Sequence, residues 1–454
     1  MAIETINPAN EKTVKTFKPF SKKEINKIIK NVNNDYAEWK KTSFNKRKTL
    51  MLKAATILRN KKNKYAKILT LEMGKPITQA IAEVEKCAWV LEYYARNTKS
   101  ILSKKIIKTD ASESYVQFDP IGIVLAVMPW NFPFWQVFRF AAPALMAGNA
   151  AILKHASNVP MSALAIEEIF QKAGFPKNIF RTLLITGNQV ENVIENPLVK
   201  ATTLTGSEYA GSMVASKSGK MLKKSVMELG GSDPFIILKD ADLELATTTA
   251  VTARMLNNGQ SCIAAKRFIV VEKVYDKFIK LFKEKMEAIV VGNPMKKETQ
   301  LGPIARKDLL LELHEQVLLS EKKGAKILLG GKILKRKGYY YPATILTNVK
   351  KGMPAYDQEL FGPVASVIKV KNEEEAIFVA NDTQFGLGAS LWTNNLKQAK
   401  KLTAQIDSGS VFINGMVKSD PRLPFGGIKL SGYGRELSHY GIKEFVNIKT
   451  VWIR

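Results

Sequence analysis

Residues 121–153 read IGIVLAVMPWNFPFWQVFRFAAPALMAGNAAIL and form the most apolar part of the chain. This part opens with Ile121–Val127 and closes with Ala150–Leu153, and each segment has the length and composition of a buried strand. Pro129, Asn131 and further interruptions between the two segments would be costly in lipid. We therefore interpret these residues as protein core, and we expect no membrane span.

The residues that follow have helical periodicity. Pro160–Lys172 places Leu164, Ile169 and Phe170 on one face that we predict to point inward, and Gly174 stands where such a helix would end. Further strands are predicted at Arg181–Ile185, Ala201–Leu204 and Ser225–Leu229. Turns and helical segments alternate with these strands, which predicts a parallel sheet in a doubly wound α/β layer.

A second series begins after Pro234 and predicts a second α/β domain of similar size. Leu243–Leu256 and Tyr275–Ile289 have helical patterns, and Phe268–Val271 has the pattern of a strand. Lys104–Phe118 is different, because it is polar and favours β-structure without helical periodicity. We expect it to form a projecting hairpin.

Length and charge limit the classes of protein that fit. A chain of 454 residues exceeds one typical core, and a hydrophobic content of 46% is that of a globular protein. The formal net charge of +28 favours polyanions as partners. Most of the basic residues are lysines dispersed along the chain, however, whereas phosphate and base recognition tends to use clustered arginine forks. We therefore expect weak, salt-dependent sticking but no specific nucleic-acid binding.

Cysteine and histidine are scarce. The chain has two cysteines, Cys87 and Cys262, and three histidines, and none of them has the spacing of metal ligands. A disulfide framework is excluded, and no metal site is expected. The N-terminal residues carry no apolar run of the kind found in signal peptides. These observations predict a protein of the reducing cytoplasm.

Three polar residues stand where they could carry chemistry. Cys262 ends the segment NNGQSC, which we expect to be a flexible turn after an apolar helix. A lone cysteine is more often a buried filler, but the Gly-Gln lead-in favours a reactive thiol. Glu228 ends a predicted strand, so it is either buried beside a partner or poised as a base with a raised pKa. Asn131, in an apolar segment, must find hydrogen-bond partners or serve as a preorganised donor.

A loose phosphate-binding element accompanies them. Gly206 and Ser207 end a predicted strand, and Gly211 follows in the next helix. Amide groups at a helix start suit a pyrophosphate. An ordinary strand–turn–helix joint would look the same, and no complete dinucleotide fingerprint is present.

Taken together, these segments resemble the aldehyde dehydrogenase superfamily. The motifs occur in the family's order: Pro129-Trp130-Asn131-Phe132-Pro133, Glu228-Leu229-Gly230-Gly231, Gly259-Gln260-Ser261-Cys262, Glu359-Leu360-Phe361-Gly362-Pro363 and Pro424-Phe425-Gly426-Gly427. The resemblance spans nearly the whole chain, and the separation of Glu228 from Cys262 is the family's spacing. It implies an NAD(P)-dependent enzyme that oxidises an aldehyde to a carboxylic acid.

The resemblance assigns the catalytic roles. The Cys262 thiolate would attack the aldehyde carbon, and the Asn131 amide with the Cys262 backbone N–H would hold the oxyanion. After hydride transfer to the nicotinamide, Glu228 would activate the water that hydrolyses the thioester. Related acylating enzymes that use coenzyme A lack this glutamate, so its presence favours release of the free acid.

The cofactor would be NADP or NAD. The resemblance implies that Gly206–Ser207 contact the pyrophosphate, Lys154 the adenosine ribose and Glu359 the nicotinamide ribose. Phe361 would lie against the nicotinamide ring, with Trp130 in the same site.

Two departures from the family pattern matter. Many NAD-specific members carry a glutamate three residues after the motif lysine, where this chain has Ser157. We therefore expect NADP to be used well and NAD to be accepted. Some members carry a second cysteine beside the nucleophile as a redox switch, but Ile263 and Ala264 exclude a local disulfide here.

The family also implies three parts. They are a Rossmann-type NAD(P)-binding domain over 1–103 and 120–229, an α/β catalytic domain over 230–433, and a β oligomerisation arm over 104–119 and 434–454. The arm would pair the hairpin with the strand Phe445–Ile453 across a subunit boundary. A homodimer or homotetramer is expected, because such edges need a partner.

The substrate prediction rests on weaker signals. Trp135–Arg139 and the tail Gly434–His439 resemble the succinate-semialdehyde dehydrogenases within the superfamily. Arg139 and Ser419 stand in regions where family members contact a substrate carboxylate, which favours succinate semialdehyde. The alternatives are a neutral aliphatic aldehyde or lactaldehyde, or a binding protein that reuses the scaffold. Intact Cys262, Glu228 and Asn131 argue against the last of these.

Overall fold

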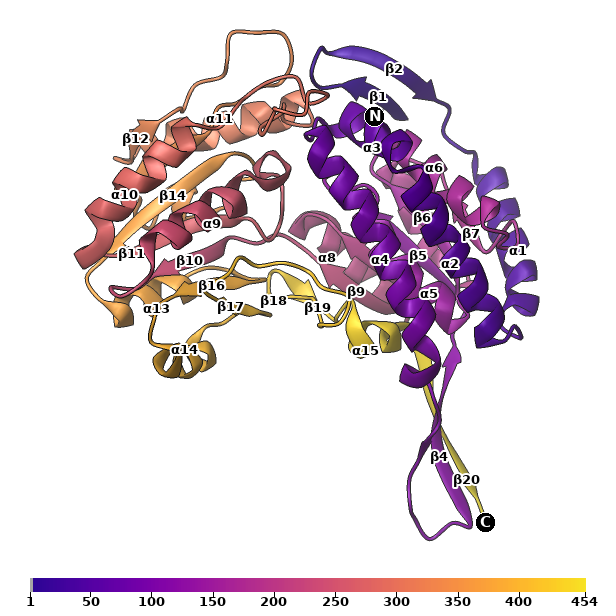
Figure 1. Cartoon of the computed structure of the whole chain (residues 1–454). Helices are drawn as coiled ribbons and strands as arrows, with labels where there is room; N and C mark the ends of the chain where they lie inside the picture. Colours follow the sequence, from indigo (N-terminus) through magenta and orange to yellow (C-terminus); the bar gives the residue numbers. More distant parts are fainter. Residues whose placement is uncertain (1–2) are drawn as a thin grey trace.

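Two largely parallel sheets lie in neighbouring lobes of the molecule (Figure 1). The computed structural model of the chain describes residues 3–454. Apolar strands form the centre of each sheet, and helices pack against them. The predicted α/β fold, with a Rossmann-type sheet and a second α/β layer, is therefore confirmed.

The first sheet is the layer predicted from the sequence. Its order is β19-β9-β8-β5-β6-β7, and every strand except the edge strand β19 is parallel to its neighbours. The strands are β5 Ile123–Met128, β6 Ala150–His155, β7 Phe180–Thr182, β8 Val199–Thr205, β9 Lys224–Glu228 and β19 Gly432–Tyr433. The five predicted strands are all present, although β7 ends at Thr182 rather than at Ile185.

Helices that pack on this sheet follow its strands in sequence. They are α5 Trp135–Ala147, α6 Pro160–Lys172, α7 Val190–Glu195 and α8 Glu208–Lys220, with a 3₁₀ turn η1 at Gly187–Gln189. Helix α6 has the predicted bounds, and Ile169 and Phe170 are buried as predicted. The inward placement of Leu164 was wrong, because its side chain is 37% exposed. The buried stripe runs through Ile166 and Phe170, and the helical period turns Leu164 away from it.

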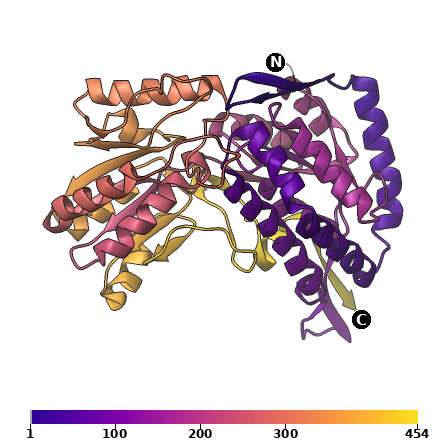
Figure 2. The same cartoon turned by 45° about the horizontal axis from the view of Figure 1, so that its top comes forward.

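The N-terminal residues form a hairpin and four helices that the sequence patterns did not reveal. These elements are β1 Ile3–Asn7, β2 Lys12–Phe17, α1 Lys22–Trp39, α2 Phe44–Asn60, α3 Lys62–Met73 and α4 Ile77–Ile101. Helix α1 begins with a capping box, in which the Ser21 hydroxyl accepts from the Glu24 N–H and the Glu24 carboxylate accepts from the Ser21 N–H. Helix α4 packs against α2, α3 and α5 (Figure 2), which brings its side chains to the edge of the site.

The second sheet has the order β12-β13-β14-β11-β10-β16-β17, and only the edge strand β12 is antiparallel. Its strands are β10 Asp233–Ile237, β11 Ala265–Val271, β12 Lys326–Leu329, β13 Thr344–Thr347, β14 Val364–Val370, β16 Ala389–Trp392 and β17 Val411–Ile413. The accompanying helices are α9 Leu243–Met255, α10 Glu272–Glu287, α11 Lys307–Lys322, α12 Pro354–Asp357, α13 Glu373–Asn381 and α14 Leu396–Leu402, with 3₁₀ turns η2 Leu256–Gly259 and η3 Thr403–Gln405. The predicted α9, α10 and β11 are present.

A β-arm projects from the first lobe and carries the C-terminus (Figure 1). It consists of β3 Lys105–Ile106, β4 Glu113–Pro120 and β20 Val446–Ile453. The predicted pairing of the C-terminal strand with the hairpin is present, but it lies within one chain, because β20 pairs along its whole length with β4. The two strands are antiparallel, and the start of β20 lies beside the end of β4, with Val446 opposite Pro120.

The remaining elements are short. They are the two-stranded pair β15 Phe385–Gly386 and β18 Ile428–Lys429, the short helix α15 Ser438–Gly441 and the 3₁₀ turn η4 Ile442–Phe445. Among residues 3–454, no helix has both the length and the apolar character needed to cross a bilayer.

Candidate active site

The candidate site lies at the carboxyl ends of the strands of the first sheet. Strand β5 leads into Trp130 and Asn131, β8 into Gly206–Ser207, and β9 into Leu229 and Gly230. Because β5, β8 and β9 are parallel neighbours, these segments meet at one edge of the sheet. Ligands of open α/β sheets bind in the crevice at this edge.

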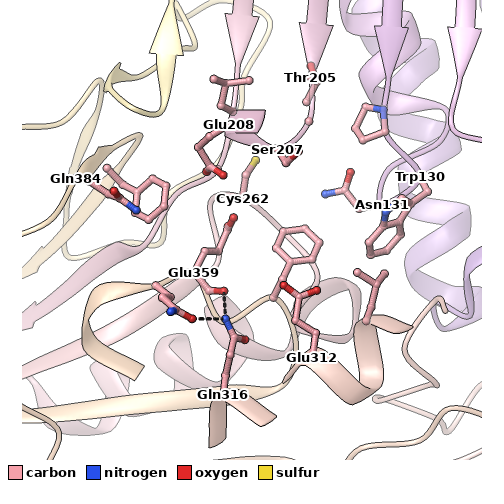
Figure 3. A pocket seen from close by; sticks show the side chains of 18 residues that line it. Trp130, Asn131, Thr205, Ser207, Glu208, Cys262, Glu312, Gln316, Glu359 and Gln384 are labelled. Carbon is pink, nitrogen blue, oxygen red and sulfur yellow. Dashed lines mark hydrogen bonds between the residues drawn. The ribbon is translucent and has the colours of Figure 1, made fainter. Parts of the chain in front are cut away.

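A cavity of about 410 Å³ lies along this edge, and Cys262 points into it (Figure 3). The predicted residues that line it are Trp130, Asn131, Gly206, Ser207, Cys262, Glu359 and Phe361. They come from both lobes, so the cavity lies between the two sheets. The structure thus brings most of the predicted catalytic and cofactor residues around one space.

The loop that carries Cys262 is not the flexible turn we predicted. Asn257, Asn258 and Gly259 have positive φ angles of 58°, 59° and 72°, and all three residues are buried. The Asn258 amide donates to the carbonyl oxygens of Gly74 and Pro303, both at 2.9 Å. Buried side-chain hydrogen bonds therefore hold a left-handed backbone that asparagine and glycine tolerate better than other residues.

Buried charges surround the Cys262 thiol. Burial raises the pKa of Cys262 to about 12, whereas the nearby Lys266 ammonium acts in the opposite direction. Lys266 donates to the carbonyl oxygens of Ser261 and Cys262, both at 2.8 Å, and lies 3.0 Å from a carboxylate oxygen of Glu359. One cation thus positions the nucleophile loop, favours its thiolate and contacts a predicted cofactor residue.

Asn131 is placed beside the nucleophile loop. Its side chain is 4% exposed, and its Nδ2 donates to the carbonyl oxygen of Gln260 at 3.2 Å. The Asn257 amide donates to the backbone oxygen of Asn131 at 2.8 Å, which ties the two loops together. An amide NH₂ group has two donors, so one N–H of Asn131 is free for an oxyanion near Cys262.

Glu228 lies in a cluster of buried charges behind the cavity. Its carboxylate faces Gly426, and its oxygens have no hydrogen-bond partner among residues 3–454. Burial, and then the negative charge of Glu436, raises the pKa of Glu228 well above its usual range. Arg139 forms an ion pair with Glu436, so one guanidinium serves two buried carboxyl groups. Glu228 therefore holds a proton more readily than an exposed glutamate does.

Several predicted cofactor residues line one wall of the cavity between the lobes. Trp130 and Phe361 make an edge-to-face pair with ring centroids 5.7 Å apart. The Glu359 carboxylate accepts from the Gly231 N–H at 3.2 Å, and Gly230 faces the carboxylates of Glu208 and Glu359. A side chain at position 230 would collide with both carboxylates, so glycine keeps this wall of the cavity open.

Lys154 and Ser157 lie further along the same sheet edge, at and after the end of β6. Burial lowers the pKa of Lys154 from its usual value. Ser157 borders a different cavity, of about 240 Å³, together with Arg306 and Lys307. Glu4 and Asp308 line this cavity as well, and Arg306 pairs with Asp308. A serine hydroxyl can donate to an anionic group, whereas a glutamate would repel it.

Cys262 also lines another cavity of about 350 Å³, hereafter the second cavity. Apolar side chains line it, among them Phe132, Trp135, Ile263, Val417 and Phe425, and so do the cationic side chains of Lys75, Lys86, Arg139 and Lys418. Ser419 lines it as well, and its hydroxyl oxygen lies 2.8 Å from the Lys86 ammonium. Arg139 also borders this cavity, but its guanidinium lies against Phe425 at 4.7 Å and pairs with Glu436.

Three residues of the site were missed by the sequence reasoning. Lys86 comes from helix α4, Lys266 from strand β11 and Glu436 from the tail after β19. A lysine on an amphipathic helix is ordinarily a solvated residue, so Lys86 gave no local signal. Lys266 carried a usable signal, because a charged residue inside an apolar strand four positions after Cys262 must have buried partners.

The family profile and the similar sequences are all those of aldehyde dehydrogenases. The profile of the aldehyde dehydrogenase family matches residues 1–451. A probable succinate-semialdehyde dehydrogenase (NADP+) from Synechocystis sp. is 53% identical over 453 residues, which is 100% of each chain. A succinate-semialdehyde dehydrogenase (NADP+) from Mycobacterium tuberculosis is 48% identical over 456 residues, again 100% of each chain.

Solved structures agree with the sequence comparison. A succinic semialdehyde dehydrogenase from Streptococcus pyogenes, in complex with NADP+ as the cofactor, superposes with a TM-score of 0.98 at 40% identity and 100% coverage of both chains. A succinate-semialdehyde dehydrogenase from Burkholderia pseudomallei superposes with a TM-score of 0.96 at 32% identity, covering 99% of this chain and 94% of that one.

Proposed function

The chain belongs to the aldehyde dehydrogenase family, and from that premise we propose that it oxidises succinate semialdehyde to succinate with NADP+. The observation that carries the proposal is the position of Cys262, which lines both a cavity with most of the predicted cofactor residues and a largely apolar cavity with the cations Lys75, Lys86 and Arg139. An aldehyde carbon at this meeting point has the nucleophile on one side and a place for a distal carboxylate beyond it.

The first step is attack of the Cys262 sulfur on the aldehyde carbon. The new C–S bond converts the carbonyl oxygen into an oxyanion, which the free N–H of Asn131 and the Cys262 backbone N–H stabilise. The Lys266 ammonium favours the thiolate over the thiol, which offsets part of the cost of burial. Its bonds to the carbonyls of Ser261 and Cys262 fix the backbone that supplies the second donor.

The cavity between the lobes fits a dinucleotide. Gly206 and Ser207 at the start of α8 suit the pyrophosphate, the Glu359 carboxylate suits a ribose hydroxyl, and Trp130 and Phe361 offer apolar rings. When bound there, NADP+ supplies the acceptor for the hydride that leaves the former aldehyde carbon. The C=O bond then re-forms as a thioester on Cys262.

Hydrolysis of the thioester needs a base. Glu228 is the proposed base, because it is a buried carboxylate at the end of β9. It begins the motif Glu-Leu-Gly-Gly and has the family's spacing to Cys262. Its raised pKa makes the ionised form a stronger proton acceptor than an ordinary glutamate. Water loses a proton to Glu228 and attacks the thioester carbon, and the acid departs as the Cys262 thiolate is restored.

Ser157 supports the choice of NADP+. A glutamate at this place would repel a 2′-phosphate, whereas the Ser157 hydroxyl can donate to it. Arg306 and Lys307 line the same cavity as Ser157, but Glu4 and Asp308 line it too, and Arg306 pairs with Asp308. The support for the phosphate therefore comes from the Ser157 hydroxyl and from Lys154 at the end of β6. NAD+ lacks the phosphate and is accepted with lower affinity.

The assembly proposed is a homodimer or a homotetramer in the cytoplasm. The β-arm exposes Ile106 at 70%, Ile448 at 59% and Trp452 at 50%, and an apolar edge of this kind favours a partner strand or sheet. The two cysteines are free thiols, which suits a reducing compartment.

An aldehyde panel tests the proposal. We expect succinate semialdehyde with NADP+ to give the highest kcat/KM, followed by the same aldehyde with NAD+, with butyraldehyde and lactaldehyde well below. Because the walls of the second cavity are largely apolar, a neutral aliphatic aldehyde is the main competing substrate. Equal or better rates with butyraldehyde would refute the substrate assignment and leave the aldehyde dehydrogenase chemistry in place.

A further inference from the structure

Some of the cations that line the second cavity have a buried counter-ion, and others do not. The Lys75 ammonium forms an ion pair with Glu83, and both side chains are almost fully buried. The Arg139 guanidinium forms an ion pair with Glu436, also buried. Lys86 differs, because among residues 3–454 no carboxylate oxygen lies within the 4.0 Å of an ion pair with its ammonium.

The Lys86 side chain is partly buried, and the part of the chain that the structure describes places no counter-ion beside its ammonium. Its ammonium donates to the Ser419 hydroxyl at 2.8 Å and lies 4.2 Å from the centre of the Trp135 ring. Burial, and then the positive charge of Arg139, lowers the pKa of Lys86 to about 8. An anion beside this ammonium would reverse both effects, since it restores the Coulomb attraction that burial leaves unsatisfied.

We propose that Lys86, with Ser419, binds the distal carboxylate of the substrate and sets the preference for ω-carboxylated aldehydes. This inference rests on the proposed function. Lys86 and Cys262 line the same cavity, so one molecule can place its aldehyde carbon at the sulfur and its carboxylate at the ammonium. Trp135 and Phe132 line the cavity as well and offer apolar surface to the methylene groups of the substrate.

Lys86 replaces Arg139 as the residue that grips the carboxylate. To bind a substrate anion, Arg139 would have to weaken its ion pair with Glu436 and its contact with the Phe425 ring. Losing that partner would leave the Glu436 carboxylate buried and unpaired next to Glu228. Arg139 is thus a positioning residue for the carboxyl cluster, whereas Lys86 is available to a ligand.

The variant Lys86→Met tests this assignment, because methionine keeps the length of the side chain and removes its charge. We expect kcat/KM for succinate semialdehyde to fall roughly ten- to a hundredfold, as is typical for loss of a charge-assisted contact. Most of the loss should appear in KM, and kcat/KM for butyraldehyde should stay within about twofold of the wild-type value. Lys86→Arg keeps the positive charge and should keep the preference for succinate semialdehyde over butyraldehyde.

Lys418→Met is the matched control. Lys418 borders the same cavity but is exposed to solvent. Its replacement therefore removes one positive charge that water already screens. We expect this variant to change the ratio of the two kcat/KM values by less than about twofold. A drop as large as that of Lys86→Met would mean that the cavity attracts the substrate by its general charge, and the assignment to Lys86 would be wrong.

The pH dependence of the same ratio gives an independent readout. Titratable groups that face Lys86 are Glu83 and Cys87 on α4, Arg139 on α5 and Asp420 on the loop after β17. Dividing kcat/KM for succinate semialdehyde by that for butyraldehyde cancels the titration of Cys262 and Glu228, which both substrates share. The wild-type ratio should fall as pH rises past about 8, as Lys86 loses its proton, and the Lys86→Met ratio should not depend on pH.

The outcomes separate this inference from the proposed function. If the wild type does not prefer succinate semialdehyde, the proposed function fails. If it does, and Lys86→Met keeps the wild-type ratio or slows both aldehydes equally, the proposed function stands and the role of Lys86 is refuted.

Discussion

The Lys266 ammonium donates a 2.8 Å hydrogen bond to the Cys262 carbonyl oxygen and lies 3.0 Å from a carboxylate oxygen of Glu359. The side chain is 2% exposed, so this contact is made in a desolvated environment. A single lysine thereby connects the nucleophile loop to the residue proposed to bind the nicotinamide ribose.

Replacing this lysine should make the nucleophile less reactive. Lys266→Met removes the positive charge that lowers the pKa of Cys262, so we expect iodoacetamide to alkylate Cys262 about tenfold more slowly at pH 8, one pKa unit being a tenfold change in thiolate. Lys285→Met, at an exposed ion pair with Glu244, is the control for loss of one lysine. Alkylation of Lys266→Met at the wild-type rate would show that Lys266 acts only on the backbone.

Glu228→Gln should separate acylation from hydrolysis. We expect a rapid burst of NADPH followed by turnover slowed by about a hundredfold or more, because the amide cannot accept the proton of water. In the wild type, the rate of hydrolysis should rise with pH, since burial and the charge of Glu436 raise the pKa of Glu228 and so disfavour the ionised form that accepts the proton. The stopped-flow burst amplitude measures the first effect, and Glu312→Gln, an exposed residue of the cofactor cavity, is the control. Steady turnover of Glu228→Gln at the wild-type rate would remove Glu228 from the mechanism.

Ser157→Glu should change the choice of cofactor. A carboxylate close to the 2′-phosphate of NADP+ should weaken its binding about tenfold or more, with little effect on NAD+. Ser157→Ala removes only the hydroxyl and should cause a smaller loss. The dissociation constants of both cofactors, measured by titration of the enzyme, provide the check. An unchanged NADP+ affinity in Ser157→Glu would show that position 157 does not face the phosphate.

His155 should make the fold sensitive to acid. Its Nε2 lies 2.8 Å from the carbonyl oxygen of Pro133, and its Nδ1 accepts from the Ala156 N–H at 3.0 Å. Burial lowers the pKa of His155 to about 4 from 6.5, so the unfolded chain binds more protons than the folded one between these values. Stability should therefore fall as pH drops from about 6.5 to 4, by roughly 3 kcal/mol at the acid end.

His155→Asn serves as the comparison for this acid sensitivity, because asparagine can donate to Pro133 but does not titrate. The midpoints of thermal unfolding of the two proteins should converge as pH falls below about 6.5. A constant difference between them from pH 7.5 to 4.5 would contradict a neutral buried His155.

Much of the fold could be predicted because its signals are local. The helix Pro160–Lys172 has a proline at its first position and a periodic apolar stripe, and its bounds were predicted without error. Leu164 was misplaced because the spacing of apolar residues alone does not fix the centre of the buried face. The C-terminal strand was expected to pair with the hairpin of another subunit, whereas β20 pairs with β4 of its own chain, because a pairing between strands far apart in sequence leaves no local signal.

The site was harder to predict where it depends on tertiary contacts. Motifs identified Cys262 and Asn131, and the structure places them around one cavity. The rigid backbone before Cys262 could not be foreseen, since it depends on bonds from Asn258 to the distant residues Gly74 and Pro303. Lys86 could not be foreseen either, because the lack of a counter-ion for it among residues 3–454 is a property of the packed cavity and not of helix α4.

A covalent thioester on Cys262 is the central intermediate of the proposed mechanism, and mass spectrometry can detect it directly. Glu228→Gln enzyme is mixed with succinate semialdehyde and NADP+, quenched in acid and digested. We predict that the peptide containing Cys262 gains the mass of one succinyl group, that the buried Cys87 gains none, and that no adduct forms without NADP+. Cys262→Ala should form no NADPH above background, whereas Cys87→Ala should stay active. Absence of the adduct on Cys262 during the burst, or full activity in Cys262→Ala, would contradict the account.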